Sequence, residues 1–183
     1  MTQTQTADDV LKFWFEDSTP DSWFGKDPDF DTEIERRFGQ TITKALAGRL
    51  DRWADTAAGC LALIVVLDQF TRNVFRDTPR AFAGDEMALA LSLRCVERGY
   101  VEHPDEAYRQ FMLMPMMHSE DLSVQDRSLP LFRKYCSART HDYAVRHRDI
   151  IAMFGRFPHR NKILGRPSSD EERAFLSQPR SSF

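Results

Sequence analysis

The chain has 183 residues, of which 42% are hydrophobic and 29% charged, and this balance predicts a single domain over residues 1–183 with a well-buried core. The formal net charge of -3 gives no overall field that would attract nucleic acid or an anionic membrane surface, so neither is an expected partner. The three cysteines, Cys60, Cys95 and Cys136, form no C-x-x-C pair, which predicts reduced, buried thiols. The N-terminal residues lack the basic and apolar regions of a signal peptide, and the expected location is the cytoplasm.

Helix start signals and turn residues divide the first part of the chain into short segments. Thr6, with Asp9 three residues later, predicts an N-cap and a first short helix. A turn is expected over residues 19–22, because Thr-Pro-Asp-Ser is a turn cluster. After this turn, Trp23 and Phe24 are expected to pack on the core from a loop.

A second helix has the most regular apolar pattern of the chain. Asp27 followed by Pro28 predicts its N-cap and first turn, and Gly48 predicts its end. Its apolar residues recur in steps of four: Phe30, Ile34, Phe38, Ile42 and Leu46. Residues 50–55 are expected to connect this helix to the next, which Thr56 can cap.

Residues 61–76 begin as an unbroken apolar run and end in polar side chains. The run is too short to span a bilayer, which needs roughly 20 apolar residues, and predicts a helix buried in protein that weakens near Thr71. If the helix continues, its polar residues form two adjacent stripes, one of Asp68, Arg72 and Arg76 and the other of Gln69 and Asn73. A buried carboxylate needs a partner, so Asp68 is expected to pair with Arg72 or Arg76, leaving one arginine for a ligand. The alternative is a solvent-exposed ion pair at the end of an amphipathic helix.

The second half of the chain contains four further long helical patterns and one short one. We expect helices over 78–99, from 104 to a kink or end at Pro115, from Asp121 or Ser123 towards Cys136, over 140–154, and after Ser169. No segment alternates apolar and polar residues long enough to predict a strand. The predicted fold class is therefore all-α, a compact array of roughly eight helices. Residues 107–115 are similar to the tail of a tetratricopeptide repeat, but no second copy follows.

A second polar cluster, His118, Ser119, Glu120 and Asp121, directly follows the apolar run Phe-Met-Leu-Met-Pro-Met-Met. A histidine and two carboxylates at a helix start could bind a metal, act as acid and base, or cap the helix. The capping interpretation rests on the preference of helix starts for serine and acidic residues. The methionines are expected to fill the core.

A third polar cluster spans a helix end and the loop after Gly155. It runs from His147, Arg148 and Asp149 to Arg166 and includes Arg156, His159, Arg160 and Asn161. A helix C-terminus favours arginine and histidine on dipole grounds, but this does not explain the dense turn Pro-His-Arg-Asn at residues 158–161. A turn of this kind can present binding groups, and a solvated basic loop is the alternative.

The known metal and nucleophile motifs are absent from the sequence. There is no H-E-x-x-H, no cysteine and histidine set with zinc spacing, no G-x-S-x-G and no glycine-rich phosphate loop. The dipeptide His141-Asp142 is similar to that of helical metal-dependent phosphohydrolases, which remain an alternative. We predict no metal site and no cofactor.

Three segments together carry a family resemblance: Leu-Asp-Gln-Phe-Thr-Arg-Asn-Val-Phe-Arg, Met-Pro-Met-Met-His-Ser-Glu-Asp-Leu-Ser-Val-Gln and Phe-Gly-Arg-Phe-Pro-His-Arg-Asn-Lys-Ile-Leu-Gly-Arg. They resemble the hallmark segments of an uncharacterised bacterial family, domain-of-unknown-function family 924. The resemblance covers nearly the whole chain and implies an all-helical, tetratricopeptide-like domain with no established activity. Thr71 stands where the family pattern usually has proline, so the turn after Phe70 is expected to be looser or more helical here. The polar positions that the resemblance carries over are Asp68, Gln69, Arg72, Asn73, Arg76, His118, Ser119, Glu120, His147, Arg156, His159, Arg160 and Asn161.

These observations lead to three hypotheses. The first is a small-molecule site where the three polar clusters converge, with an anionic ligand favoured because arginines outnumber carboxylates among the motif residues. In a catalytic version, His118 or Glu120 would transfer the proton. The second is a helical module that binds a peptide or protein through a groove lined by Trp14, Trp23, Phe24 and Trp53. The third is a purely structural polar network, and the oligomeric state is left open.

Overall fold

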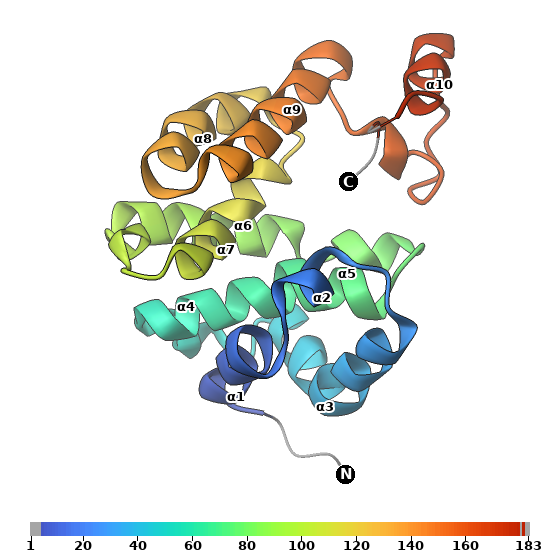
Figure 1. The fold of residues 1–183 in the computed structure, drawn as a ribbon. Helices are drawn as coiled ribbons and strands as arrows, with labels where there is room; N and C mark the ends of the chain where they lie inside the picture. Colours follow the sequence, from blue (N-terminus) through green and yellow to red (C-terminus); the bar gives the residue numbers. More distant parts are fainter. Residues whose placement is uncertain (1–4, 180, 182–183) are drawn as a thin grey trace.

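The structure, a computed structural model, describes residues 5–179 and 181; most of those residues are helical, and none of them forms a strand (Figure 1). Its α-helices are α1 (Ala7–Lys12), α2 (Pro20–Phe24), α3 (Pro28–Leu46), α4 (Ala57–Ile64), α5 (Thr71–Val74), α6 (Asp85–Glu97), α7 (Glu106–Met117), α8 (Leu122–Tyr135), α9 (Ala138–Phe154) and α10 (Asp170–Leu176). Shorter 3-10 and π-helical turns extend or connect several of them. The predicted all-α class is confirmed, whereas tetratricopeptide-like superhelical packing stays a prediction.

Several helix starts lie where the capping signals predict them. The side chain of Thr6 accepts from the backbone N–H of Asp9, and the Asp9 carboxylate accepts in return from the Thr6 backbone, so a full capping box starts α1. A second capping box, formed by Ser169 and Glu172, starts α10. The carboxylate of Asp27 caps α3. These local contacts satisfy backbone donors that would otherwise have no partner at a helix start.

The helix at the centre of the fold runs without interruption from Ala57 to Val74. Its middle, Val65–Phe70, is π-helical, and π-turns inside α-helices are frequent at functional sites. The helix does not weaken at Thr71, whose hydroxyl donates to the Leu67 carbonyl oxygen at 2.7 Å. By length and composition this 18-residue helix could cross a membrane, but 78% of it is buried inside the protein, which is typical of a core helix.

Gly84 allows the start of α6 to lie directly against the central helix. A Cβ atom at this position would stand 2.2 Å from the carbonyl oxygen of Leu67, well inside any normal contact distance. Because Asp68 follows Leu67 and Asp85 follows Gly84, this close approach brings the two carboxylates into one region. The absence of a side chain at Gly84 therefore positions the polar cluster described below.

The main hydrophobic core is formed by helices from α1 to α9, and a smaller one covers the C-terminal end. The smaller core consists of Ile150, Ile151 and Phe157, with Phe154 and Phe175 packed against it. Figure 1 shows α6 and α7, then α8 and α9, stacked above the central helix, with α10 at the far end. The loop after α9 thus returns towards the start of α6.

Several local predictions differ from the structure. The turn expected over residues 19–22 lies mostly within the short helix α2, and Phe24 at its end is 63% exposed rather than packed into the core. Pro115 does not end its helix at once, because α7 contains the proline and continues to Met117; the alternative, a kink, stays a prediction. Of the cysteines predicted to be buried, Cys60 and Cys95 are, while Cys136 is only partly buried.

Candidate functional site

Asp68 and His118 form a polar contact at the junction of two apolar helices. Asp68 is 1% exposed, and its Oδ1 lies 2.7 Å from Nδ1 of His118, the residue that ends α7. Since an ionised carboxylate can only accept hydrogen bonds, Nδ1 carries the proton and donates it to Asp68. The other ring nitrogen of His118, Nε2, makes no hydrogen bond within the described part of the chain.

Two further side chains hold the carboxylate of Asp68 in its charged form. A guanidinium nitrogen of Arg72 lies 3.0 Å from Oδ1, and the amide of Gln69 donates to Oδ2. Burial alone would raise the pKa of Asp68, but the charge of Arg72 and the contacts of His118 and Gln69 hold that pKa well below its usual range. Asp68 is therefore a buried, permanently charged acceptor for His118.

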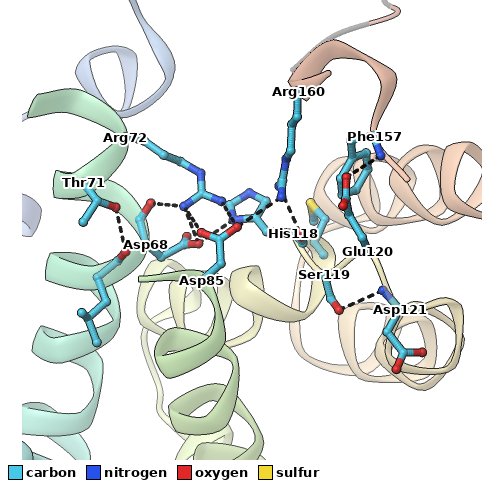
Figure 2. Close-up of polar contacts among 12 residues, drawn as sticks. Asp68, Thr71, Arg72, Asp85, His118, Ser119, Glu120, Asp121, Phe157 and Arg160 are labelled. Atoms are coloured by element: carbon cyan, nitrogen blue, oxygen red, sulfur yellow. Dashed lines mark hydrogen bonds and ion pairs between the residues drawn. The ribbon is translucent and has the colours of Figure 1, made fainter. Parts of the chain in front are cut away.

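Asp85, the first residue of α6, joins two arginines from distant parts of the sequence (Figure 2). Its Oδ1 lies 2.9 Å from Arg72, and its Oδ2 lies 3.2 Å from Arg160 in the loop after α9. Arg160 also donates to the backbone carbonyl oxygen of His118 at 3.0 Å. The polar segments around Asp68, His118 and Arg160 thus meet in one place, which we call the Asp68 cluster and define as Asp68, Gln69, Arg72, Asp85, His118 and Arg160.

Aromatic rings enclose the arginines of the Asp68 cluster. The Arg160 guanidinium lies 4.7 Å from the ring centres of both Phe82 and Phe157. The Arg72 guanidinium lies 5.6 Å from the centre of the Phe82 ring. Burial, with repulsion from Arg72, lowers the pKa of Arg160 to about 10, so this side chain is still charged at neutral pH. Its Nε is buried and has no partner among the described residues.

Two more predicted site residues, His147 and His159, lie beside the Asp68 cluster. The rings of His147 and His118 are 6.1 Å apart, and Nδ1 of His147 lies 2.7 Å from the carbonyl oxygen of Tyr143. Burial lowers the pKa of His147 to about 3. Burial, with the charge of Arg160, lowers that of His159 to about 4. Both rings are thus neutral at physiological pH.

Arg76 and Asn73 point away from the Asp68 cluster. Arg76 forms a two-pronged ion pair with Asp31 of α3, and the amide of Asn73 donates to the same carboxylate at 2.7 Å. The single stripe predicted for Asp68, Arg72 and Arg76 was therefore wrong. Asp68 pairs with Arg72, which was one of its two predicted partners. The other, Arg76, pairs with Asp31 and is therefore not left for a ligand.

Glu120 and Ser119 connect segments instead of joining the Asp68 cluster. Glu120 accepts from the backbone N–H of Phe157 at 2.7 Å, and both of its oxygens accept from Arg166, at 2.7 and 3.0 Å. The hydroxyl of Ser119 accepts from the backbone N–H of Asp121 at 3.2 Å. Because both Glu120 oxygens are engaged, the geometry does not support the predicted proton transfer by this side chain.

Arg156 and Asn161 hold the C-terminal helix α10 in place. Arg156 forms a two-pronged ion pair with Glu172, at 2.7 and 2.9 Å. Asn161 donates to the same carboxylate at 3.2 Å and accepts from Arg166 at 3.0 Å. These two residues, predicted to bind a ligand, therefore hold in place the loop that carries Arg160.

Three residues outside the predicted clusters complete these contacts, Asp31, Asp85 and Glu172, together with Arg166, which ends the third cluster but was not among the predicted site residues. In the sequence, the first two resemble ordinary acidic residues in the first turn of a helix, and Glu172 is explained by its capping box. One signal for Asp85 was present, the glycine directly before it, since a glycine beside a helix start can mark close approach of two backbones. These carboxylates, with Asp68 and Glu120, also cancel the predicted surplus of arginine charge. Each of five arginines pairs with one of the carboxylates: Arg72, Arg76, Arg156, Arg160 and Arg166.

Chemically, the Asp68 cluster offers a histidine nitrogen that can accept a proton and guanidinium groups that can donate hydrogen bonds. Within the described residues, no three histidine, cysteine or acidic side chains are placed to hold a metal ion, so the phosphohydrolase alternative has no ligand set there.

Two surface hollows lie away from the Asp68 cluster. One, of about 930 Å³, lies at α9 and α10, and the other, of about 580 Å³, lies at α6 to α8. Neither is lined by Asp68, His118 or Arg160. Trp14, proposed to line a peptide groove, is fully buried.

Comparison with known proteins agrees with the motif resemblance. The chain is similar to a solved structure of a protein of unknown function, ATU0120 from Agrobacterium tumefaciens, with 38% sequence identity and a TM-score of 0.88 over 93% of this chain and 96% of that one. A search of curated proteins found no match. Residues 10–180 match the family described as bacterial protein of unknown function, DUF924. The chain belongs to the DUF924 family.

Proposed function

We propose that the Asp68 cluster is a small-molecule site that favours an anionic ligand. The observation that carries this proposal is the orientation of His118 by a buried, charged carboxylate. The hydrogen bond from Nδ1 to Asp68 leaves Nε2 without a hydrogen bond to the described residues, on a side chain that is 16% exposed. A buried carboxylate that fixes the tautomer of a partly exposed histidine is the arrangement used for general-base catalysis.

The arginines would supply the preference for an anion. Arg72 and Arg160 approach the cluster from the central helix and from the loop after α9, and both contact Asp85. Their two positive charges are balanced by Asp68 and Asp85, so an anion would be recognised through directed guanidinium hydrogen bonds more than through net charge. We expect the best ligands to be carboxylates or phosphate esters that can also share a proton with His118.

In a catalytic version of this site, His118 is the proton acceptor and the arginines stabilise negative charge that develops on the substrate. Glu120 has no part in this proposal, because its ion pair with Arg166 occupies it. Asp68 keeps His118 in the correct tautomer through its contact with Nδ1. The cytoplasm remains the expected location.

One observation favours the second candidate, a module that binds a peptide or protein. Phe24 is 63% exposed although its ring lies parallel to that of Phe111, with 6.3 Å between centres, and edge-on to that of Trp23. An exposed aromatic ring beside a buried aromatic cluster is a typical anchor for a partner. The two candidates use different residues and can be tested separately.

A thermal-shift screen of phosphate, phosphate monoesters and small carboxylates tests the anion site. A ligand at 100 times its Kd stabilises the folded state by about 2.7 kcal/mol, which raises the Tm of a protein of this size by roughly 5–10 °C. We expect this rise for wild type and its loss in Arg72→Ala and Arg160→Ala. Arg76→Ala is the matched control, because it removes a partly buried arginine that pairs with Asp31 instead. No response in wild type, or an equal response in all variants, would contradict the proposal.

A further inference from the structure

Two cysteines lie in contact inside the main core, away from the Asp68 cluster. Cys60 of α4 and Cys95 of α6 are 35 residues apart in sequence, yet their Sγ atoms are 3.3 Å apart. Both side chains are fully buried. The thiol of Cys95 donates to Cys60, and the thiol of Cys60 lies 3.6 Å from the carbonyl oxygen of Leu91.

We propose that Cys60 and Cys95 form a reversible dithiol-disulfide pair that links α4 to α6 when the protein meets a hydroperoxide. A disulfide bond is about 2.05 Å long, so the two sulfurs must approach by little more than about 1 Å. Because the two sulfurs are so close, the pair can be oxidised to a disulfide. Two apolar side chains at these positions would only fill space. This proposal is independent of the anion site, because it uses none of the residues in the Asp68 cluster.

The reaction is balanced by one equivalent of hydrogen peroxide. The Cys60 thiolate attacks one peroxide oxygen, the O–O bond breaks, and the leaving hydroxide takes up a proton to become water. The resulting sulfenic acid is then attacked at sulfur by Cys95, and the thiol proton of Cys95 leaves with the second hydroxide as water. Two thiols are oxidised to one disulfide and one peroxide is reduced to two waters, and an external thiol reverses the reaction by exchange.

The surroundings favour Cys60 as the thiol that reacts first. The hydrogen bond from Cys95, opposed by burial and helped by the charge of Arg94, lowers the pKa of Cys60. The third cysteine differs, because burial, with the charge of Glu106, raises the pKa of Cys136 to about 12. Cys136 therefore serves as an internal comparison in the same chain.

The link would join the two elements that carry the acidic residues of the Asp68 cluster. The central helix continues from Cys60 to Asp68, and α6 begins at Asp85 and continues to Cys95. Since both cysteines are buried, oxidation requires that a small oxidant enter the core or that α4 and α6 separate briefly. We therefore expect slow oxidation by hydrogen peroxide in the folded protein.

The test is thiol mapping of the native protein after treatment with hydrogen peroxide. Remaining thiols are alkylated after denaturation, and the products are identified by intact mass and peptide mapping. We expect a mass loss of about 2 Da before alkylation, a fall from the three thiols of the chain to one, and a linked pair of peptides containing Cys60 and Cys95. Dithiothreitol should restore all three thiols.

Cys136→Ser is the matched control and should form the same link at the same rate. Cys60→Ser should not form the link. If Cys60→Ser fails to fold, Cys95→Ala replaces it and should also not form the link. Survival of all three thiols in wild type, over-oxidation of Cys136 alone, or a link between different chains would overturn the proposal. The peptide map of wild type decides the matter even if neither core variant folds.

Discussion

Asp68 shows, at the scale of single residues, how a charge is kept in the core of this protein. Its carboxylate accepts from Gln69 and His118 and pairs with Arg72, so each oxygen has at least one donor. A buried ion without such partners costs several kcal/mol, and removal of one partner leaves the other buried and unpaired. Asp85 is likewise neutralised by ion pairs, since it lies within contact of two arginines at once.

The two neutral histidines beside the Asp68 cluster predict a loss of stability in mild acid. The pKa values of His147 and His159, about 3 and about 4, lie below the value of roughly 6.5 expected in the unfolded chain. Between these values the unfolded state binds more protons, so stability is full above about pH 6.5 and declines as the pH falls towards the folded pKa values. Each histidine should lower the free energy of unfolding by about 2 kcal/mol between pH 7.5 and pH 5.

Urea unfolding at pH 7.5, 6 and 5 measures this loss. The pKa values of Asp68, Glu120 and Glu172 are lowered by their hydrogen bonds and arginine partners, so these carboxylates contribute little in this window. His147→Gln, which keeps a polar group near the Tyr143 carbonyl, should remove about half of the pH dependence, and the other half should remain with His159. A stability that stays constant or rises from pH 7.5 to pH 5 would show that these rings are not held neutral.

At the scale of elements, start signals were easier to predict than end signals. The caps at Thr6, Asp27, Thr56, Asp121 and Ser169 are local, because each side chain bonds to a backbone group two or three residues away. Pro115 does not end α7, which continues to Met117 although proline has no backbone N–H to donate. The 3-10 and π-helical turns were not predicted, because they depend on how neighbouring helices pack.

Gly84 offers a direct test of how the elements position the Asp68 cluster. Gly84→Ala would place a Cβ atom 2.2 Å from the Leu67 carbonyl oxygen, a backbone atom that cannot rotate away. We expect a loss of about 2–3 kcal/mol in the free energy of unfolding, as for an overpacked core. The displacement of α6 should also weaken the anion response of the Asp68 cluster.

Gly39→Ala is the matched control, measured by urea unfolding alongside Gly84→Ala. Gly39 lies within α3, and an added Cβ would meet nothing within 4 Å. Alanine favours a helix interior over glycine by about 0.5–1 kcal/mol, so this variant should be more stable than wild type. Equal effects of the two substitutions would show that the close approach of α6 does not determine stability.

At the scale of the whole molecule, three segments far apart in the sequence meet at Asp68, His118 and Arg160. The sequence predicted these three residues because each polar cluster follows or flanks an apolar segment and therefore had to lie near the core. It could not predict Asp85 or Asp31, since the choice of a carboxylate for each arginine depends on which helices pack together. Nor could it predict that Glu120 and Arg156 brace the C-terminal loop and helix.

The protonation state of the His118 ring tests the central claim most directly. We propose measurement of the ¹⁵N shifts of both ring nitrogens by NMR near pH 8, with and without phosphate, in wild type and in Asp68→Asn. Because Asp68 accepts from Nδ1, the neutral ring should carry its proton on Nδ1, and phosphate should shift Nε2. In Asp68→Asn this preference should weaken or reverse, because the amide can also donate. A wild-type ring protonated on Nε2, or an Nε2 signal that does not respond to phosphate or any other anion of the thermal-shift screen, would contradict the account.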